Sequence, residues 1–354
     1  MKRVLMSGDT VGGVWTFTLA LAEALGRHGV EVVLAAMGGL PSESQRAEAR
    51  QIPNLRLVES ALKLEWMDDP WADVEASRPW LLDLEQSVAP DVIHLNTYAH
   101  AALPWSAPVV LTAHSCVLSW WLAVKGEDAP PEWNRYRDEV ARGLRAAALV
   151  TAPSRAMLDA LQECYGRLAY ASVVYNGCNF ARFRPEEKTE MILSAGRVWD
   201  AGKNVASLAE VAAGLRWPVY VAGEAKGSCV PGCRMLGRLS REELAAWYSR
   251  AGIYALPARY EPFGLSVLEA ALSGCALVLG DIASLREIWQ DAAVYVPPDD
   301  PRTLREVLEA LIDDEPLRTA LAEWSMERAR QFSAERMAQQ YLNAYEEVSV
   351  LCAS

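Results

Sequence analysis

The sequence of 354 residues lacks the features that mark several common classes of protein. It has no uninterrupted run of about 18 apolar residues, and its apolar N-terminal stretch is too short for a signal-peptide core. Acidic residues outnumber basic ones by 46 to 34, and no run of lysine and arginine offsets this charge. The seven cysteines are odd in number and scattered. We therefore expect a cytoplasmic protein with reduced thiols, no transmembrane segment and no nucleic-acid partner.

Several motifs of catalysis and cofactor binding are also missing. There is no Asp-x-Asp pair to hold a metal–nucleotide complex, no P-loop, and no Gly-x-Gly-x-x-Gly for a dinucleotide. The four histidines all lie in the first 114 residues and no Gly-x-Ser-x-Gly accompanies them, which disfavours a hydrolase triad. Cys229 and Cys233 have neither a second pair nor nearby histidines, so they do not indicate zinc. We expect no metal and no cofactor.

Short apolar runs alternate with helical patterns through both halves of the chain. The composition, 51% hydrophobic and 23% charged, is that of a folded protein, and 354 residues exceed one ordinary core. Apolar runs separated by helices predict buried parallel strands. The expected strands are 4–6, 30–35, 91–95, 109–112 and 149–151 in the first half, and 191–193, 219–221, 253–255, 276–279 and 294–296 in the second.

This alternation predicts an α/β protein with two Rossmann-like, doubly wound parallel-sheet domains that face a cleft. We place an N-terminal, acceptor-side domain at 1–185 and a donor domain at 186–330. The polar, proline-containing stretch 183–188 suits a hinge between them. A final helix, within 331–354, is expected to cross back to the first domain.

The stretch from Glu261 to Glu269 is the first candidate site. Glu261 precedes a proline at the end of an expected strand, and a helical pattern begins near Gly264. The free N–H groups of a helix start attract anions such as a diphosphate. Two surface glutamates on an ordinary helix would fit the same spacing.

Two cations form the second candidate. Arg197 and Lys203 lie on a glycine-containing loop after the first strand of the second half, where such sheets bind ligands. They could clamp a diphosphate, with Lys203 exposed in the cleft, or could simply be solvated.

The N-terminal half contributes three further candidates. Gly12 and Gly13 follow the first strand and would let a ligand approach the backbone. His114 follows the strand 109–112, at a ligand-binding edge, although a lone histidine is often structural. Trp120 and Trp121 lie just beyond it and could stack on an acceptor, or could fill the core. Trp66, Trp71, Trp80 and Trp133 could lie nearby.

Taken together, these motifs resemble family 4 of the retaining, metal-independent glycosyltransferases, which have the GT-B fold. The stretch 259–269 is similar to that family's Glu-x7-Glu signature, 196–203 to its Gly-Arg…Lys segment, and Gly12-Gly13 to its glycine loop. Leu236-Gly237-Arg238 resembles the loop that packs the nucleotide base. The resemblance spans nearly the full length. Asn204 departs from it, because glycine is common after the lysine.

The resemblance implies a role for each residue. Glu261, with the amides near Phe263, Gly264 and Leu265, would hold the hydroxyls of the donor sugar, and Glu269 would bind the ribose. Arg197 and Lys203 would neutralise the departing diphosphate. His114 would line the sugar pocket. Leu236 and Arg238 would contact the base.

The expected function is thus transfer of a sugar from a nucleotide-diphosphate sugar, with retention, to an unidentified saccharide, lipid-linked or small-molecule acceptor. A nucleotide-sugar epimerase of the same fold and a non-catalytic nucleotide-sugar-binding protein remain alternatives. A nicotinamide dehydrogenase is disfavoured by the missing glycine motif. The donor's base and sugar and the oligomeric state stay open.

Overall fold

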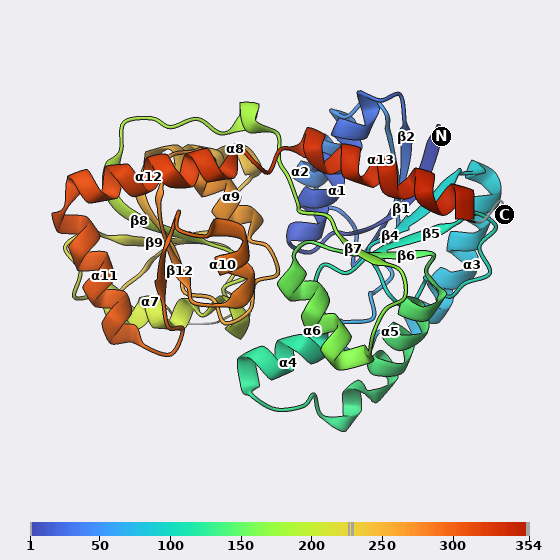
Figure 1. The fold of residues 1–354 in the computed structure, drawn as a ribbon, viewed down its shortest axis with the longest axis horizontal. Helices are drawn as coiled ribbons and strands as arrows, with labels where there is room; N and C mark the ends of the chain where they lie inside the picture. The colour runs from blue at the N-terminus through green and yellow to red at the C-terminus, as the bar shows by residue number, and fades with distance from the viewer. Residues whose placement is uncertain (1, 226, 228–229, 352–354) are drawn as a thin grey trace. The chain divides into compact units, whose positions relative to one another are not determined.

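The structure is a computed structural model that describes residues 2–225, 227 and 230–351. The chain forms two compact units (Figure 1). The first comprises Met1–Leu122, Glu127–Gly177 and Ala334–Ser354, and the second comprises Ala123–Gly126 and Cys178–Ser333. In the described part of each unit, every strand pairing is parallel. The predicted fold class of two parallel-sheet α/β units is confirmed.

The first unit is built on a seven-stranded sheet with the order β3-β2-β1-β4-β5-β6-β7. Its central strands β1, β4 and β5 are almost wholly buried, as their continuous apolar runs predict. The strands are β1 (Arg3–Asp9), β2 (Glu31–Met37), β3 (Leu55–Glu59), β4 (Val92–Leu95), β5 (Val109–Thr112), β6 (Leu149–Ala152) and β7 (Ala171–Val173). The helices are α1 (Gly13–Gly26), α2 (Glu43–Arg50), α3 (Trp71–Val88), α4 (Val117–Lys125), α5 (Asn134–Ala146), α6 (Arg155–Tyr165) and α13 (Ala334–Leu351).

The second unit is built on a six-stranded sheet with the order β10-β9-β8-β11-β12-β13. Apolar side chains of α7 and α11 pack on one face of this sheet in a single buried cluster. The strands are β8 (Thr189–Ala195), β9 (Val219–Ala222), β10 (Arg234–Gly237), β11 (Ala251–Leu256), β12 (Ala276–Gly280) and β13 (Val294–Val296). The helices are α7 (Val205–Ala212), α8 (Arg241–Arg250), α9 (Leu265–Leu272), α10 (Ala283–Trp289), α11 (Pro301–Asp313) and α12 (Glu315–Ala329).

Each sheet has one point at which the strand order reverses. In the first unit β1 lies between β2 and β4, and in the second unit β8 lies between β9 and β11. Loops that leave the carboxyl ends of the two central strands then diverge to opposite faces, which opens a crevice for ligands. The candidate ligand-binding loops are therefore those that follow β1 and β4 in one unit and β8 and β11 in the other.

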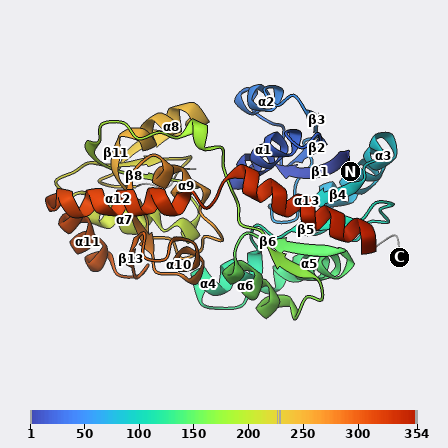
Figure 2. The same cartoon turned by 45° about the horizontal axis from the view of Figure 1, so that its top comes forward.

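The last helix, α13, belongs to the first unit, where it packs along α1 and β5 (Figure 2). The Tyr345 hydroxyl hydrogen-bonds to Nδ1 of the buried His94 at 2.5 Å. At the start of α13, Oε1 of Glu335 lies 2.7 Å from Nε2 of His28. Apart from Ala123–Gly126, the second unit is thus the single segment Cys178–Ser333. The stretch 183–188, expected as a hinge, lies inside the second unit, because Lys188 donates hydrogen bonds to backbone carbonyls there.

No helix in the described ranges is long and apolar enough to cross a membrane.

Candidate active site

The loops after β8 and β11 meet at the reversal point of the second sheet. The amides of Arg259 and Tyr260 both donate to the carbonyl of Gly202, at 2.9 and 3.1 Å. Beside this backbone contact, Lys203 Nζ lies 2.5 Å from Glu261 Oε2. The structure thus joins two of the predicted site residues, which are 58 positions apart in the sequence.

Glu261 is held beside the start of α9 by the turn that leads into the helix. Its Oε1 accepts hydrogen bonds from the amides of Gly264, at 2.9 Å, and Phe263, at 3.4 Å. Gly264 has φ +88°, a conformation that side chains rarely adopt, and a Cβ there would approach Val267 within 2.9 Å. The carboxylate therefore accepts the amides of the two residues that lead into α9, beside the helix N-terminus.

Arg197 is oriented by a carboxylate of its own loop. Its Nη2 donates to Asp200 Oδ2 at 2.9 Å, while Asp200 Oδ1 accepts the amide of Gly202 at the same distance. Sequence reasoning missed Asp200, although its spacing of three from Arg197 is a signal for such a pair. Both candidate cations of this site are thus paired with carboxylates.

Lys203 is more enclosed than the sequence suggested. Its side chain is 14% exposed and that of Glu261 is 12% exposed, so the expectation of a solvent-exposed lysine was wrong. The reason is the turn that follows the lysine. Asn204 has φ +54° and its Nδ2 donates to the carbonyls of Pro257 and Pro298, which fixes the lysine against the neighbouring loop. Asparagine tolerates this left-handed conformation, so it can stand where the resemblance leads us to expect glycine.

Glu269 lies on α9 and is only 8% exposed. Burial raises the pKa of its carboxyl from 4.5 to about 7, while the positive charges of Arg241 and Arg182 and the Tyr248 hydroxyl act in the opposite direction. Near neutral pH this carboxyl is therefore close to half ionised. Such a group can accept hydrogen bonds from hydroxyls once a ligand stabilises its charge.

The proposed base loop lies at the end of β10. The Gly223 amide donates to the carbonyl of Gly237 at 2.8 Å, which joins the ends of β9 and β10. A Cβ at Gly223 would come within 1.9 Å of the Gly196 carbonyl, so this close approach of three strand ends requires glycine. Leu236 is partly buried and Arg238 is exposed. Within the described part of the chain, no hydrogen bond or ion pair joins Leu236 or Arg238 to Lys203 or Glu261, and the role of these two residues stays a prediction.

In the first unit, Gly12 ends the turn between β1 and α1, and Gly13 is the first residue of α1. Gly12 has φ +83° and precedes the first helical residue. Asp9, at the end of β1, accepts the Val11 amide at 2.7 Å and the Trp66 indole N–H at 3.1 Å. The glycine turn therefore lies beside a fixed carboxylate and indole, at the reversal point of the sheet. Sequence reasoning singled out Trp66 but missed its partner Asp9.

His114 lies at the end of β5 and is partly exposed. Its Nε2 is 2.7 Å from Asn96 Oδ1, at the end of the adjacent strand β4, and its ring contacts Phe17 at a centroid distance of 4.4 Å. Burial lowers its pKa to about 3, so the imidazole is neutral and donates that N–H to Asn96. Asn96 was not foreseen. The orientation it imposes leaves Nδ1 as the remaining acceptor.

The tryptophans fall into two groups. Trp120 and Trp121, on α4, are partly exposed and pack edge to face at 5.8 Å. Trp133 packs on Tyr136, whose hydroxyl accepts the Val117 amide at the start of α4. Trp71 instead stacks under the Arg135 guanidinium at 4.4 Å. Of Trp71 and Trp133, these contacts link only Trp133 to the start of α4, through Tyr136. Acceptor binding by Trp120 and Trp121 stays a prediction.

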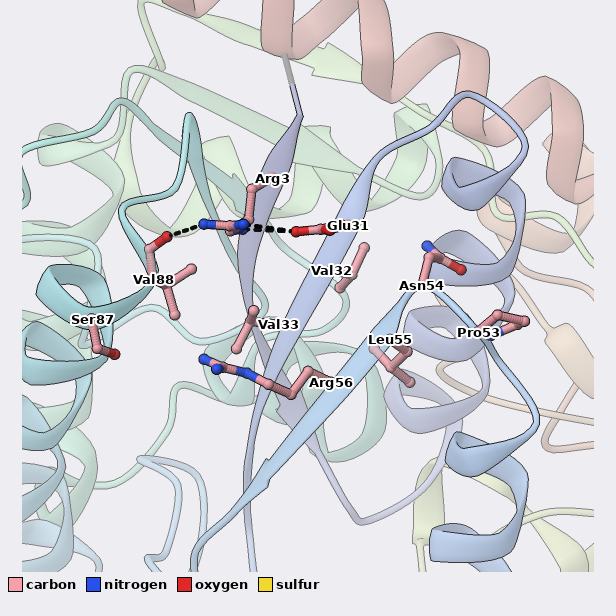
Figure 3. Close-up of a pocket in the computed structure, with 10 residues that line it drawn as sticks. All are labelled: Arg3, Glu31, Val32, Val33, Pro53, Asn54, Leu55, Arg56, Ser87 and Val88. Atoms are coloured by element: carbon pink, nitrogen blue, oxygen red, sulfur yellow. Dashed lines mark hydrogen bonds and ion pairs between the residues drawn. The ribbon is translucent and has the colours of Figure 1, made fainter.

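An open groove of about 480 Å³ lies elsewhere in the first unit, at the amino ends of its strands (Figure 3). Arg3 crosses it and is bound to Glu31 and to the Val88 carbonyl. Parallel sheets bind ligands at the opposite, carboxyl edge, so the groove is no candidate.

Metal ligands are not gathered anywhere in the described part of the chain: no group of three or more His, Cys, Asp or Glu side chains could hold an ion there. Of the two cysteines weighed for zinc, Cys229 lies outside the described residues.

Two family models match successive parts of the chain. Residues 11–182 match the family model "Glycosyltransferase Family 4", and residues 179–328 match "Glycosyl transferases group 1". Glycogen synthase of Mycobacterium tuberculosis is 29% identical over 270 residues, 66% of this chain and 63% of that protein. The chain therefore spans less than two thirds of this relative.

Solved structures share the fold at low identity. Sucrose-phosphate synthase of Thermosynechococcus elongatus superposes with a TM-score of 0.80 at 18% identity, over 100% of both chains. HepE of Anabaena, in complex with UDP-glucose, gives 0.76 at 16%, over 98% of this chain and 100% of that one.

Proposed function

The chain belongs to family 4 of the glycosyltransferases, and on that premise we propose that it transfers a hexosyl group, with retention and without a metal, from a nucleotide-diphosphate sugar. The observation that carries the proposal is the pairing of Lys203 with Glu261 at the start of α9. This one place combines a cation, a helix N-terminus and a carboxylate. Those are the groups that a diphosphate and sugar hydroxyls require.

The diphosphate is proposed to bind between Arg197 and Lys203. When the bond between sugar and diphosphate breaks, negative charge grows on the leaving oxygen, and fixed cations lower the barrier because they need no reorganisation. Their ion pairs with Asp200 and Glu261 hold them in place beforehand. Lys203 retains further N–H donors for phosphate oxygens while it holds Glu261.

The remaining contacts follow the same resemblance. Glu261, already fixed by two amides, accepts hydrogen bonds from sugar hydroxyls, and Glu269 accepts them from the ribose. Leu236 and Arg238 are proposed to contact the base. For His114, neutrality suits a hydrogen bond to a hydroxyl and excludes a permanent charge beside the reacting carbon. The acceptor is left open, with Trp120 and Trp121 as its candidate contacts.

The test begins with thermal shift against nucleotide sugars of different bases, UDP-glucose among them, because a ligand that binds the folded state raises its melting temperature. The donor that binds is then incubated with the protein and a panel of saccharide, lipid-linked and small-molecule acceptors. Proton NMR follows both the nucleotide diphosphate released and the anomeric configuration of the product.

Three results separate the alternatives. Transfer with retained configuration supports the proposal. Isomerisation of the donor without any acceptor would identify an epimerase instead. Binding with no turnover of any donor and acceptor would favour a binding protein. The control variant for general effects of charge removal is Arg302→Ala, because the side chain of Arg302 is 87% exposed.

A further inference from the structure

A network of buried polar side chains crosses the first unit from α3 to the end of β1. Its four members are at most 2% exposed, and the proposed reaction does not use them: Ser77, His100, Thr97 and Ser7. Each is in hydrogen-bond contact with the next, at 2.7 Å from Ser77 to His100, 2.9 Å from His100 to Thr97 and 3.4 Å from Thr97 to Ser7. Polar groups at this depth are kept in place by such bonds.

The α3 end of this buried network fixes the tautomer of His100. Ser77 Oγ lies 2.8 Å from the carbonyl of Val74, which can only accept, so the Ser77 proton is directed there. The Ser77 oxygen then accepts a hydrogen bond from Nε2 of His100. Burial lowers the pKa of His100 to about 3, so its ring is neutral and carries one N–H. His100 is therefore protonated on Nε2, and its Nδ1 is an acceptor.

This tautomer sets the direction of the remaining hydrogen bonds. Thr97 donates its proton to Nδ1 of His100, so the Thr97 oxygen accepts from Ser7. Ser7 Oγ accepts the Asn96 amide at 2.8 Å, and the Ser7 carbonyl accepts Asn96 Nδ2 at 2.5 Å. Because that carbonyl holds the nitrogen of the carboxamide, Oδ1 of Asn96 faces His114. The buried network thus ends at the oxygen that accepts the His114 proton.

The loop that follows β4 is also tied to the end of β5. The Tyr98 hydroxyl donates to the carbonyl of Ser115 at 2.7 Å, and the Tyr98 amide donates to the buried carboxyl of Glu65 at the same distance. Ser115 is the neighbour of His114. The loop and the strand end are therefore fixed relative to each other, which allows the network to control one orientation of the His114 ring.

We propose that His100 and Thr97 are positioning residues that hold His114 in one tautomer, with its proton on Nε2, so that Nδ1 accepts a hydrogen bond from a hydroxyl of the transferred sugar. They act through Ser7 and Asn96 and do not touch the substrate. A neutral imidazole without such partners exchanges between two tautomers, and only one of them offers a lone pair on Nδ1. The contact with sugar rests on the proposed function, whereas the tautomer does not.

The chemical test determines the tautomers by NMR. The chain has four histidines, so protein labelled with nitrogen-15 histidine gives four imidazoles, which single replacements assign. Long-range nitrogen–proton spectra distinguish a protonated ring nitrogen from an unprotonated one. Near neutral pH, His100 and His114 should each carry their proton on Nε2. A proton on Nδ1 of His114, or a mixture of its two tautomers, would overturn the proposal in the wild-type protein alone.

The variant Thr97→Val tests the network, because it removes the hydroxyl and keeps the shape of the side chain. The Ser7 hydroxyl then loses its acceptor and no longer fixes Asn96, so the His114 spectrum should show both tautomers. Thr97→Ser should restore one. The matched control is Thr18→Val, since Thr18 is fully buried and its hydroxyl has no hydrogen-bond partner among the described residues. An unchanged His114 spectrum in folded Thr97→Val would overturn the proposal.

A second variant decides the question if Thr97→Val does not fold. Ser77→Ala removes the acceptor of His100 Nε2 at the opposite end of the network. The His100 spectrum should then show both tautomers, and the His114 spectrum should change with it. An unchanged His114 spectrum beside an altered His100 spectrum would overturn the coupling between the two rings.

The functional test measures sugar transfer by the same variants. In Thr97→Val, kcat/KM should fall about three- to tenfold, the effect of one hydrogen bond between neutral groups, and should return in Thr97→Ser. Affinity for the nucleotide diphosphate, which lacks the sugar, should stay unchanged. Wild-type transfer by a variant with mixed tautomers would overturn the role in the reaction. Absence of transfer by the wild-type protein would count against the proposed function, and the spectra would still decide the tautomer.

Discussion

Replacement of Lys203 by methionine tests the phosphate clamp most directly. Methionine keeps most of the apolar stem of lysine and removes only the charge and its donors. In the folded protein this breaks the 2.5 Å contact with Glu261, whose side chain is 12% exposed. Glu261 keeps the amides of Gly264 and Phe263, so its charge is not left without partners.

Two magnitudes follow from this geometry. Breaking a buried ion pair costs about 3–5 kcal/mol and an exposed one about 0–1, so with the amides retained we expect a loss of about 1–2 kcal/mol in the free energy of unfolding. Loss of one preorganised cation at a developing charge should lower kcat by about two to three orders of magnitude. The effect on the rate is thus much larger than the effect on stability.

The assay measures initial rates of nucleotide diphosphate release with the donor found by thermal shift, together with urea unfolding of the same samples. Lys203→Met is compared with Glu261→Gln, the double variant, and the surface control Arg302→Ala. The two single changes should not be additive, because each removes the same ion pair. A folded Lys203→Met protein with wild-type kcat would show that the lysine does not act on the leaving group.

Three further predictions concern pH, metal and acceptor. Because burial raises the pKa of Glu269 from 4.5 to about 7, the folded state binds more protons than the unfolded state between these values. The contribution of Glu269 to the free energy of unfolding is fully present below about pH 4.5 and is lost as the pH rises through 7, a fall of about 3 kcal/mol. In Glu269→Gln, urea unfolding should therefore show a free energy of unfolding that depends less on pH. Activity should survive EDTA; complete loss that Mg²⁺ or Mn²⁺ restores would contradict metal independence. Trp121→Ala should raise the acceptor KM while donor hydrolysis and nucleotide affinity persist, and loss of nucleotide binding or of folding would assign the indole a structural role.

The strands that the sequence predicted are those with continuous apolar runs. β1, β5 and β12 are interior strands, with a neighbouring strand on each side and side chains that are almost all buried. Apolar residues are therefore favoured along the whole of each strand. Three strands escaped prediction: β3, β7 and β10. All three are edge strands with partly exposed side chains, and their short sequences lack any apolar run.

The site could be located from the sequence but not assembled. Strand ends and a helix start placed Lys203 and Glu261 at the same edge of one sheet. Periodicity could not show that Asp200 orients Arg197 or that Asn96 orients His114. Those contacts depend on side-chain directions across loops, and Asn96 and His114 are 18 positions apart in the sequence.

The membership of α13 in the first unit has a consequence for how the chain is made. That unit contains residues from both ends of the sequence, and the buried Nδ1 of His94 has its hydrogen-bond partner in Tyr345, while Nε2 meets Thr112. During synthesis its sheet must therefore wait, with a buried face uncovered, until the second unit has emerged. The two crossing points lie together, since Cys178 and Ser333 form a bridge within the second unit. A gene that joins Gly177 to Ala334 through a short linker should consequently yield a stable first unit, whereas one that stops at Gly177 should yield an aggregating fragment.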